Sequence, residues 1–189
     1  MSMHKPEIMC FAGPNGSGKS TITNVIRPLT HGKYINADDI MRVTFCDAMT
    51  AAKEAEALRE QCILNGEEFS FETVLSTERN LNLLKRAKEQ GYFIRCVFVL
   101  TCSPEINKVR VKNRVLNGGH DVPEDKIVSR YYKSLEMISA LIPLCDRISI
   151  YDNSGDSPAR IYKKRDSEEF FWENDFWEKH QIDKLVYGK

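Results

Sequence analysis

The sequence lacks several features that would assign it to other protein classes. No apolar run approaches the roughly 20 residues of a membrane span, and the start, Met-Ser-Met-His-Lys-Pro, has no signal-peptide core. The six cysteines include no CxxC pair, so a disulfide scaffold or a zinc site is a poor second to buried thiols in a reducing compartment. We therefore expect a cytoplasmic protein without membrane association.

The sequence also lacks a net charge. The 189 residues include 27 Lys and Arg and 27 Asp and Glu. No overall electrostatic field therefore indicates binding of nucleic acid or of an acidic partner, although local charged patches can exist. We find no internal repeat, low-complexity tract or linker. The length suits one domain, with a core of about 8–153 and a C-terminal strand and helix appendage of about 157–189.

Apolar segments alternate with helical ones along the chain. Such alternation predicts an α/β fold of three layers, in which right-handed crossovers connect a mainly parallel sheet of five or six strands. The predicted strands are 8–12, 33–36, 69–71, 92–100 and 147–152, and the predicted helices are 19–28, 37–64, 77–90, one after Ser103 and one after Pro123.

The tail after Asp156 departs from this alternation. SPARIYKKRD favours an added edge strand, whereas DSEEFFWENDFWEKHQIDKL predicts a helix rich in aromatic side chains. We favour packing of these aromatic residues on the chain's own core over a site for a partner. They are Phe170, Phe171, Trp172, Phe176 and Trp177.

The segment FAGPNGSGKST joins a predicted strand to a predicted helix. Gly13 to Ser20 match GxxxxGK[ST] at every specified position, in the context that this pattern requires. Its glycines let backbone N–H groups converge on phosphate oxygens, and the helix points its positive end at the same anion. The pattern predicts a nucleoside triphosphate site in which Lys19 reaches the β and γ phosphates and Ser20 holds Mg²⁺. The predicted nucleotide contacts are Gly13, Pro14, Asn15, Gly16, Ser17, Gly18, Lys19, Ser20 and Thr21.

Two acidic segments follow predicted strands at the edge of the sheet where this loop lies. Substrates of open parallel sheets bind beyond the carboxyl ends of the strands, so an acid placed there can accept the proton of an attacking hydroxyl. We favour Asp38 for this role and Asp39 for stabilising the helix, although both can merely complement the helix dipole behind an Asn36 cap. For Glu72, contact with substrate, Mg²⁺-bound water or an arginine and a structural ion pair are equally open.

The second half of the chain supplies positive charge. Arg110 and Arg114 lie four residues apart on one predicted helix, which ends at Gly118-Gly119, and Arg130 follows early in the next helix. Such a pair of helices is typical of a lid that closes over a triphosphate, and the alternative is an ordinary solvated helix face. His120, in the turn, is a candidate contact to phosphate or base, against the alternative of an exposed, idle histidine.

In order and spacing, five segments resemble the zeta toxin family of P-loop kinases, in particular its short single-domain members. The segments are GPNGSGKST, YINADDI, FSFETVLS, RVKNRVLNGGHDVP and SRYYKSL, and the similarity covers roughly 8–153. No guanine-reading NKxD motif occurs, and strand 92–100 does not end in the acid that longer ATPases present. These absences disfavour GTPase switches and large ATPase machines.

The resemblance implies an adenylate-kinase-like fold with a five-stranded parallel core and ATP-dependent phosphorylation of a small hydroxyl substrate. The best-known zeta toxins phosphorylate the 3′-hydroxyl of UDP-N-acetylglucosamine, and a small antitoxin covers their nucleotide site. The resemblance assigns Lys19 and Ser20 to the phosphates and Mg²⁺, Asp38 to the catalytic base, Glu72 and Thr73 to substrate contact, and Arg114 and Arg130, with Arg110 as a competitor, to the catalytic lid arginines.

Two other functions remain open at this point. One is a regulatory nucleotide-binding partner with little catalysis, and the other is a polynucleotide 5′-kinase. The neutral charge balance disfavours the second, because a basic groove with aromatic residues is expected for nucleic acid. The sequence shows no long terminal extension and no attached antitoxin, and it does not reveal the phosphoryl acceptor or the oligomeric state.

Overall fold

The computed structural model describes residues 5–26, 32–119 and 121–188, which form one seven-stranded sheet in the order β2-β3-β1-β4-β5-β6-β7. Five strands are parallel: β1 (Glu7–Ala12), β2 (Lys33–Ile35), β3 (Phe69–Thr73), β4 (Phe93–Leu100) and β5 (Arg147–Asp152). The antiparallel strands β6 (Ala159–Arg165) and β7 (Glu168–Phe171) extend one edge.

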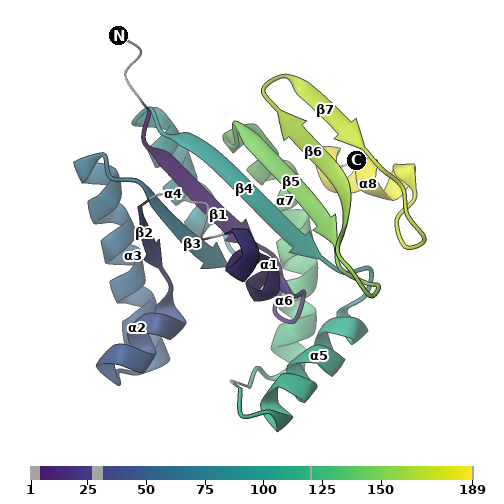
Figure 1. Ribbon diagram of the computed structural model, residues 1–189, viewed down its shortest axis with the longest axis horizontal. Coiled ribbons are helices and arrows are strands. Elements are labelled where there is room, and N and C mark those ends of the chain that lie inside the picture. The colour runs from purple at the N-terminus through teal and green to yellow at the C-terminus, as the bar shows by residue number, and fades with distance from the viewer. Residues whose placement is uncertain (1–4, 27–31, 120, 189) are drawn as a thin grey trace.

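Helices lie on both faces of this sheet and give the molecule three layers (Figure 1). The helices are α1 (Lys19–Ile26), α2 (Ala37–Thr44), α3 (Ala48–Asn65), α4 (Arg79–Glu89), α5 (Pro104–Leu116), α6 (Glu124–Glu136), α7 (Ile138–Leu141), the 3₁₀ turn η2 (Ile142–Leu144) and α8 (Lys179–Tyr187). The predicted three-layer α/β fold with a mainly parallel sheet is therefore confirmed, but the sheet has seven strands instead of the predicted five or six, because the tail adds β7 as well as β6. Among the described residues, no helix has the length and apolar character needed to cross a membrane.

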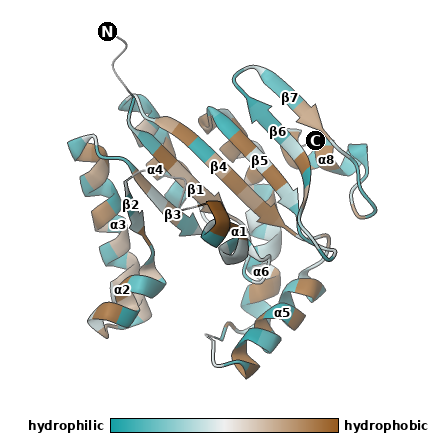
Figure 2. Cartoon of the chain, viewed as in Figure 1, coloured by the Kyte–Doolittle hydropathy of each residue, from teal (hydrophilic) through white to brown (hydrophobic). Residues whose placement is uncertain are grey.

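The central strands β1 and β4 are apolar on both faces, as Figure 2 shows by their hydropathy. On one face Met9, Phe11 and Val99 are at most 2% exposed and pack with partly buried residues of α1. On the other face the main core joins these strands to α3, α4, α7 and α8. A strand covered on both sides needs no polar alternation, which explains the continuous apolar runs in the sequence.

The predicted helix 37–64 is wrong at its centre, because α2 ends before Phe45 and α3 begins after Asp47. Phe45 adopts a left-handed conformation with φ 57°, which stops the first helix. The Asp47 carboxylate then accepts hydrogen bonds from the backbone N–H groups of Met49 and Thr50. An acid at this position is a strong helix start, and the apolar spacing across the break concealed it.

The predicted aromatic helix of the tail is also wrong. Phe170 and Phe171 belong to β7, which pairs with β6, and the helix begins only at Lys179. Trp177 is buried, whereas Phe170 and Trp172 are 41% and 42% exposed. The expected packing of the aromatic residues on the core is therefore only partly confirmed. The turn at Asp166, with φ 56°, lets the chain return as a hairpin.

Candidate functional site

The phosphate loop lies between β1 and α1, and contacts with other elements leave no room for side chains on its glycines. Gly16 has φ 79°, and a Cβ atom there would lie 2.5 Å from the Asn107 carbonyl oxygen. Gly18 has φ 87°, and its Cβ would lie 2.1 Å from Asn153 Nδ2. Both positions therefore need glycine for conformation and for space.

Two asparagines that the sequence analysis missed support the loop from outside. Asn107 on α5 donates from Nδ2 to the Asn15 carbonyl at 2.7 Å, and Asn153 after β5 donates to the Ser17 carbonyl at 2.7 Å. Asn107 is fully buried, and its Oδ1 accepts from Thr101 Oγ1 at 2.5 Å. These bonds attach the loop backbone to α5 and to the segment after β5. The burial of an asparagine within a helix is not visible in the sequence pattern.

The side chains of Lys19, Ser20 and Glu72 converge at the mouth of the loop. Lys19 Nζ lies 3.8 Å from Glu72 Oε2, and Ser20 Oγ donates to the same oxygen at 3.1 Å. The other carboxylate oxygen accepts from the Tyr34 hydroxyl at 3.1 Å. Burial lowers the pKa of Lys19 and the Glu72 charge opposes that change. The acid thus compensates a buried cation and faces the residue expected to hold Mg²⁺.

Asp38 and Asp39 begin α2 on the opposite side of the same opening. The Asn36 side chain caps α2 by accepting from the Asp38 N–H at 2.9 Å. The Asp38 side chain is exposed and lines the cavity beside Lys19, whereas Asp39 forms an ion pair with Arg42 and lies outside that lining. Adjacent positions on a helix point about 100° apart, which separates the two carboxylates.

The α5–α6 hairpin forms the other side and carries the predicted arginines. Its own small core consists of Val111, Val122 and Ile127. The hairpin is attached to the sheet by Tyr131, whose hydroxyl donates to the Thr101 carbonyl at 2.6 Å. The arginines Arg110, Arg114 and Arg130 all line the cavity. His120 lies outside the described residues.

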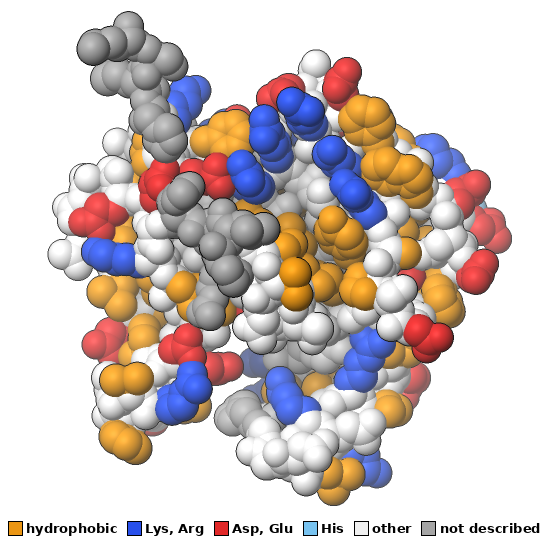
Figure 3. Space-filling model, in the orientation of Figure 1, with side chains coloured by type: hydrophobic (Ala, Val, Ile, Leu, Met, Phe, Trp, Pro, Cys, Tyr) orange, Lys and Arg blue, Asp and Glu red, His pale blue; other side chains and the backbone are white. Residues whose placement is uncertain are grey.

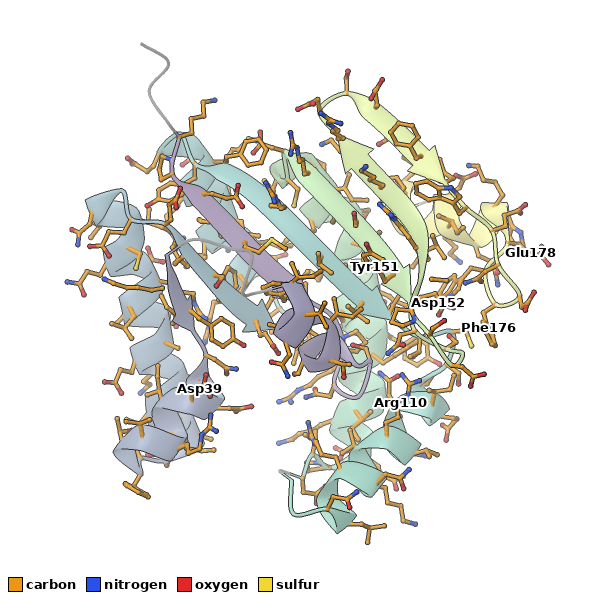
Figure 4. All side chains as sticks on the ribbon, viewed as in Figure 1. Asp39, Arg110, Tyr151, Asp152, Phe176 and Glu178 are labelled. Atoms are coloured by element: carbon orange, nitrogen blue, oxygen red, sulfur yellow. The ribbon has the colours of Figure 1, made fainter. Side chains whose placement is uncertain are left out.

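Between these two sides lies a cavity of about 840 Å³ at the carboxyl ends of the parallel strands. Figure 3 shows the molecule hollowed between α2 and α5, and Figure 4 shows Asp39 and Arg110 on opposite sides of the hollow. The predicted contacts that line it are Asn15, Gly16, Gly18, Lys19, Ser20, Thr21, Asp38, Glu72, Thr73 and the three arginines. Gly13, Pro14 and Ser17 are buried residues of the loop and do not line the cavity.

Arg59 is a further cavity residue that the sequence analysis missed. It lies on α3, is 8% exposed, and its guanidinium stacks on the Phe71 ring at 5.0 Å. Its Nε is buried without a hydrogen-bond partner. A signal existed in the sequence, because Arg59 follows Ala51 and Ala55 at helical spacing on the buried face of α3. A buried, incompletely paired arginine is suited to bind an anion.

Comparison with known proteins gives a consistent assignment. The zeta toxin family model matches residues 48–167, which is more than half of the chain. An uncharacterized protein of Haemophilus influenzae is 32% identical over 127 residues, covering 64% of this chain and 89% of the relative.

Solved structures share the fold at low sequence identity. A chain of the PezAT chromosomal toxin–antitoxin system of Streptococcus pneumoniae aligns with TM-score 0.62 and 16% identity, over 100% of this chain and 81% of the other. A chain of the AvrRxo1-ORF1:-ORF2 structure with ATP aligns with TM-score 0.73 and 13% identity, over 98% of this chain. This chain spans 64% of the length of that one. The protein therefore belongs to the zeta toxin family of P-loop kinases.

Proposed function

We propose that the protein transfers the γ-phosphoryl group of ATP, as its Mg²⁺ complex, to a hydroxyl of a small anionic metabolite such as UDP-N-acetylglucosamine. The observation that carries this proposal is the position of Asp38, which lines the same cavity as Lys19 and the three lid arginines. A base on one side and cations on the other suit an in-line transfer between them.

The residues at the mouth of the loop fit Mg²⁺ and a triphosphate. Ser20 and Glu72 offer hydroxyl and carboxylate oxygens, the donors that Mg²⁺ prefers, within 3.1 Å of each other. Bound Mg²⁺ would neutralise charge that develops on the β and γ phosphates. In this proposal Glu72 releases Lys19 when nucleotide enters, and the ammonium group then binds the phosphates in place of the carboxylate.

The chain's own residues divide the remaining work. Asp38 orients the acceptor hydroxyl and removes its proton, and Arg114 and Arg130 stabilise negative charge on the moving phosphoryl group, with Arg110 beside them. Glu72 and Thr73 contact the acceptor, as the family resemblance implies. The α5–α6 hairpin excludes water, which would otherwise compete as the acceptor.

The charge of the cavity lining supports an anionic acceptor. In addition to the lid arginines, Arg59 and Arg79 line the cavity, together with the polar side chains of Ser76, Thr77 and Asn80. Glu56 pairs with Arg79 at 3.4 Å, and Glu60 pairs with Arg86 outside the cavity, so Arg59 keeps an incompletely neutralised charge. A diphosphate or a carboxylate on the acceptor would supply the missing partner.

Two further parts of the proposal concern the cell. An ATP-dependent kinase needs a compartment that supplies ATP, which fits a cytoplasmic location. The structural relative from Streptococcus pneumoniae belongs to a toxin–antitoxin system, and we extend this to a small antitoxin as a candidate partner of this protein.

The test compares two neighbouring carboxylates. Purified wild-type protein, Asp38→Asn and Asp39→Asn are incubated with ATP, Mg²⁺ and UDP-N-acetylglucosamine, and phosphorylated product is measured by mass spectrometry. We expect Asp38→Asn to lose about 10²- to 10⁴-fold in rate, as for removal of a general base, with ATP affinity retained. Asp39→Asn should stay near wild type, because its partner Arg42 lies on the same helix surface.

An equal loss of rate in both variants, or normal turnover by Asp38→Asn, would show that Asp38 is not the catalytic base. If the wild type phosphorylates a different metabolite in a cell extract, the kinase proposal stands and the sugar nucleotide is wrong. If no compound acquires phosphate while ATP still binds, the regulatory alternative replaces the proposal.

A further inference from the structure

The sheet has one face that helices leave open. In Figure 1, α1 lies over β1 and β4 on the viewer's side, and β5, β6 and β7 carry no helix there among the described residues. Their other face packs against the main core, in which Ile150 and Tyr162 are fully buried. The open face is separate from the cavity, which lies beyond the carboxyl ends of the parallel strands.

Strand pairing brings cationic and aromatic residues together on this open face. Side chains directly opposite each other in paired strands share a face, so the register of β5 with β6 and of β6 with β7 defines the array. We call it the basic–aromatic face. It comprises Arg147, Tyr151, Arg160, Lys163, Phe170 and Trp172. Figure 3 shows Lys and Arg side chains beside hydrophobic ones over these strands.

The rings and the cations alternate within contact distance. The Arg160 guanidinium lies 5.7 Å from the Tyr151 ring centroid and 5.4 Å from that of Trp172. Trp172 stacks on Phe170 with centroids 6.2 Å apart and planes 18° apart, and Lys163 Nζ lies 6.0 Å from the Phe170 centroid. The rings are thus held side by side while keeping exposed surface.

The face carries an excess of positive charge within a chain whose net charge is zero. Arg147, Arg160 and Lys163 form no ion pair with any described carboxylate, and Arg147 Nε is buried without a hydrogen-bond partner. At the rim, Arg95 pairs with Glu7 at 3.1 Å, and Arg165 lies 3.8 Å from Asp166. Glu168 faces Arg165 across the hairpin. These pairings between acids and cations of this face therefore lie near Arg165, whereas Arg160 and Lys163 contact the rings.

We propose that this face binds single-stranded nucleic acid. Exposed rings stack with bases regardless of sequence, and neighbouring Arg and Lys side chains contact the phosphates between them. A duplex hides the faces of its bases, so the rings favour an unpaired strand. An acidic peptide would engage the cations but offers no bases to the rings. The net charge of zero disfavoured nucleic acid in the sequence analysis. Net charge sums the whole surface, so a local basic patch is hidden by acidic surface elsewhere.

The test uses a fluorescein-labelled 12-nucleotide oligouridine and the full chain, with binding followed by fluorescence anisotropy from 20 to 300 mM salt. We expect Trp172→Ala and Phe170→Ala each to weaken binding by about five-fold or more, the low end for one stacked base. Trp172→Phe should restore most of the loss. Lys163→Gln removes one phosphate contact, so the slope of log K against log salt concentration should become less steep by about 0.7.

Matched controls use the same chemistry elsewhere on the surface. Phe45→Ala removes a ring that is 92% exposed at the α2–α3 corner, and Lys112→Gln removes an exposed cation of α5. Neither should change the affinity, and saturating ATP should not displace the strand. Oligothymidine in place of oligouridine distinguishes DNA from RNA as the preferred strand.

Several results would overturn the proposal. They are undetectable binding at 20 mM salt, unchanged affinity in Trp172→Ala and Phe170→Ala, equal competition by polyglutamate of matched charge, and tighter binding of a 12-base-pair duplex. Because the proposal does not depend on the kinase function, Asp38→Asn should bind the strand like the wild type whatever its turnover.

Discussion

The two sides of the cavity are built in opposite ways. On the nucleotide side, the phosphate loop is fixed by buried groups of other elements, and the α5–α6 hairpin has a small core of its own. On the acid side, α2 contains no buried residue, and Val43, Phe45 and Met49 are 76%, 92% and 69% exposed. From this comparison we predict that the nucleotide site is preformed, whereas α2 adjusts its position when an acceptor enters.

Apart from Asp38→Asn on the acid side, the largest effect is expected from the arginines of the nucleotide side. Arg114→Ala and Arg130→Ala should each reduce kcat by about 10²- to 10³-fold, because each removes charge stabilisation of the transferring group. Steady-state kinetics of both variants and of Arg110→Ala would show which two act in transfer. Lys112→Ala removes a cation of the same helix that does not line the cavity, and it serves as the control. An equal loss in Lys112→Ala would mean that the effect comes from the lower overall positive charge of the helix.

A smaller loss is expected from breaking the preformed loop itself. Gly18→Ala places a methyl group against Asn153 Nδ2 at a φ of 87°, which should weaken ATP binding by about ten- to a hundred-fold. Isothermal titration calorimetry measures the affinity. Gly66→Ala also has positive φ but open space around it, and it should leave ATP affinity unchanged. Unaltered ATP binding by Gly18→Ala would mean that the loop is not preformed.

The hydrogen bond from Asn107 on α5 to the phosphate loop should contribute to the stability of the fold. Asn107→Ala removes a buried donor to the Asn15 carbonyl, and we expect the free energy of unfolding to fall by about 1–3 kcal/mol. Urea denaturation provides the measurement. The exposed Asn113 on the same helix is the matched control, and Asn113→Ala should stay within about 0.5 kcal/mol of the wild type.

On the acid side, a substitution is expected to stabilise the chain. Phe45→Gly relieves the left-handed conformation at φ 57° with little loss of packing, because the ring is 92% exposed. A gain of about 1 kcal/mol is expected, and thermal denaturation would detect it. Phe45→Ala keeps the strained Cβ and should not gain. A loss in Phe45→Gly would show that the acid side is more tightly packed than its exposure indicates.

The smallest effect concerns pH. Burial lowers the pKa of Lys19 below its usual range, with the Glu72 charge opposing the shift. Phosphates bind the protonated Lys19 amine. Above the lowered pKa the amine of the free protein is neutral, so ATP binding must be accompanied by uptake of a proton. ATP affinity should therefore fall as pH rises. Titration between pH 7 and 10 tests this. In Lys19→Arg the decline should disappear, and a decline of equal size there would assign it to another group.

Some elements could be predicted because their signals are local. The phosphate loop was visible from its glycines, and the strands 8–12 and 92–100 from nearly continuous apolar runs. The break at Phe45 and the hairpin of the tail were missed, since a left-handed residue and a strand pairing leave the helical spacing of apolar residues unchanged. Arg59 was missed although it occupied an apolar stripe, because its cation–ring contact joins α3 to β3.

By itself the sequence determined the alternation of strands and helices, the phosphate loop and the candidate acids, because these depend on neighbours within a few residues. Only the tertiary structure decided that Glu72 meets Lys19 and Ser20, that two asparagines support the loop, and that β5–β7 present a basic–aromatic face. Those contacts join residues far apart in the chain, and their geometry arises only when the strands align in one sheet.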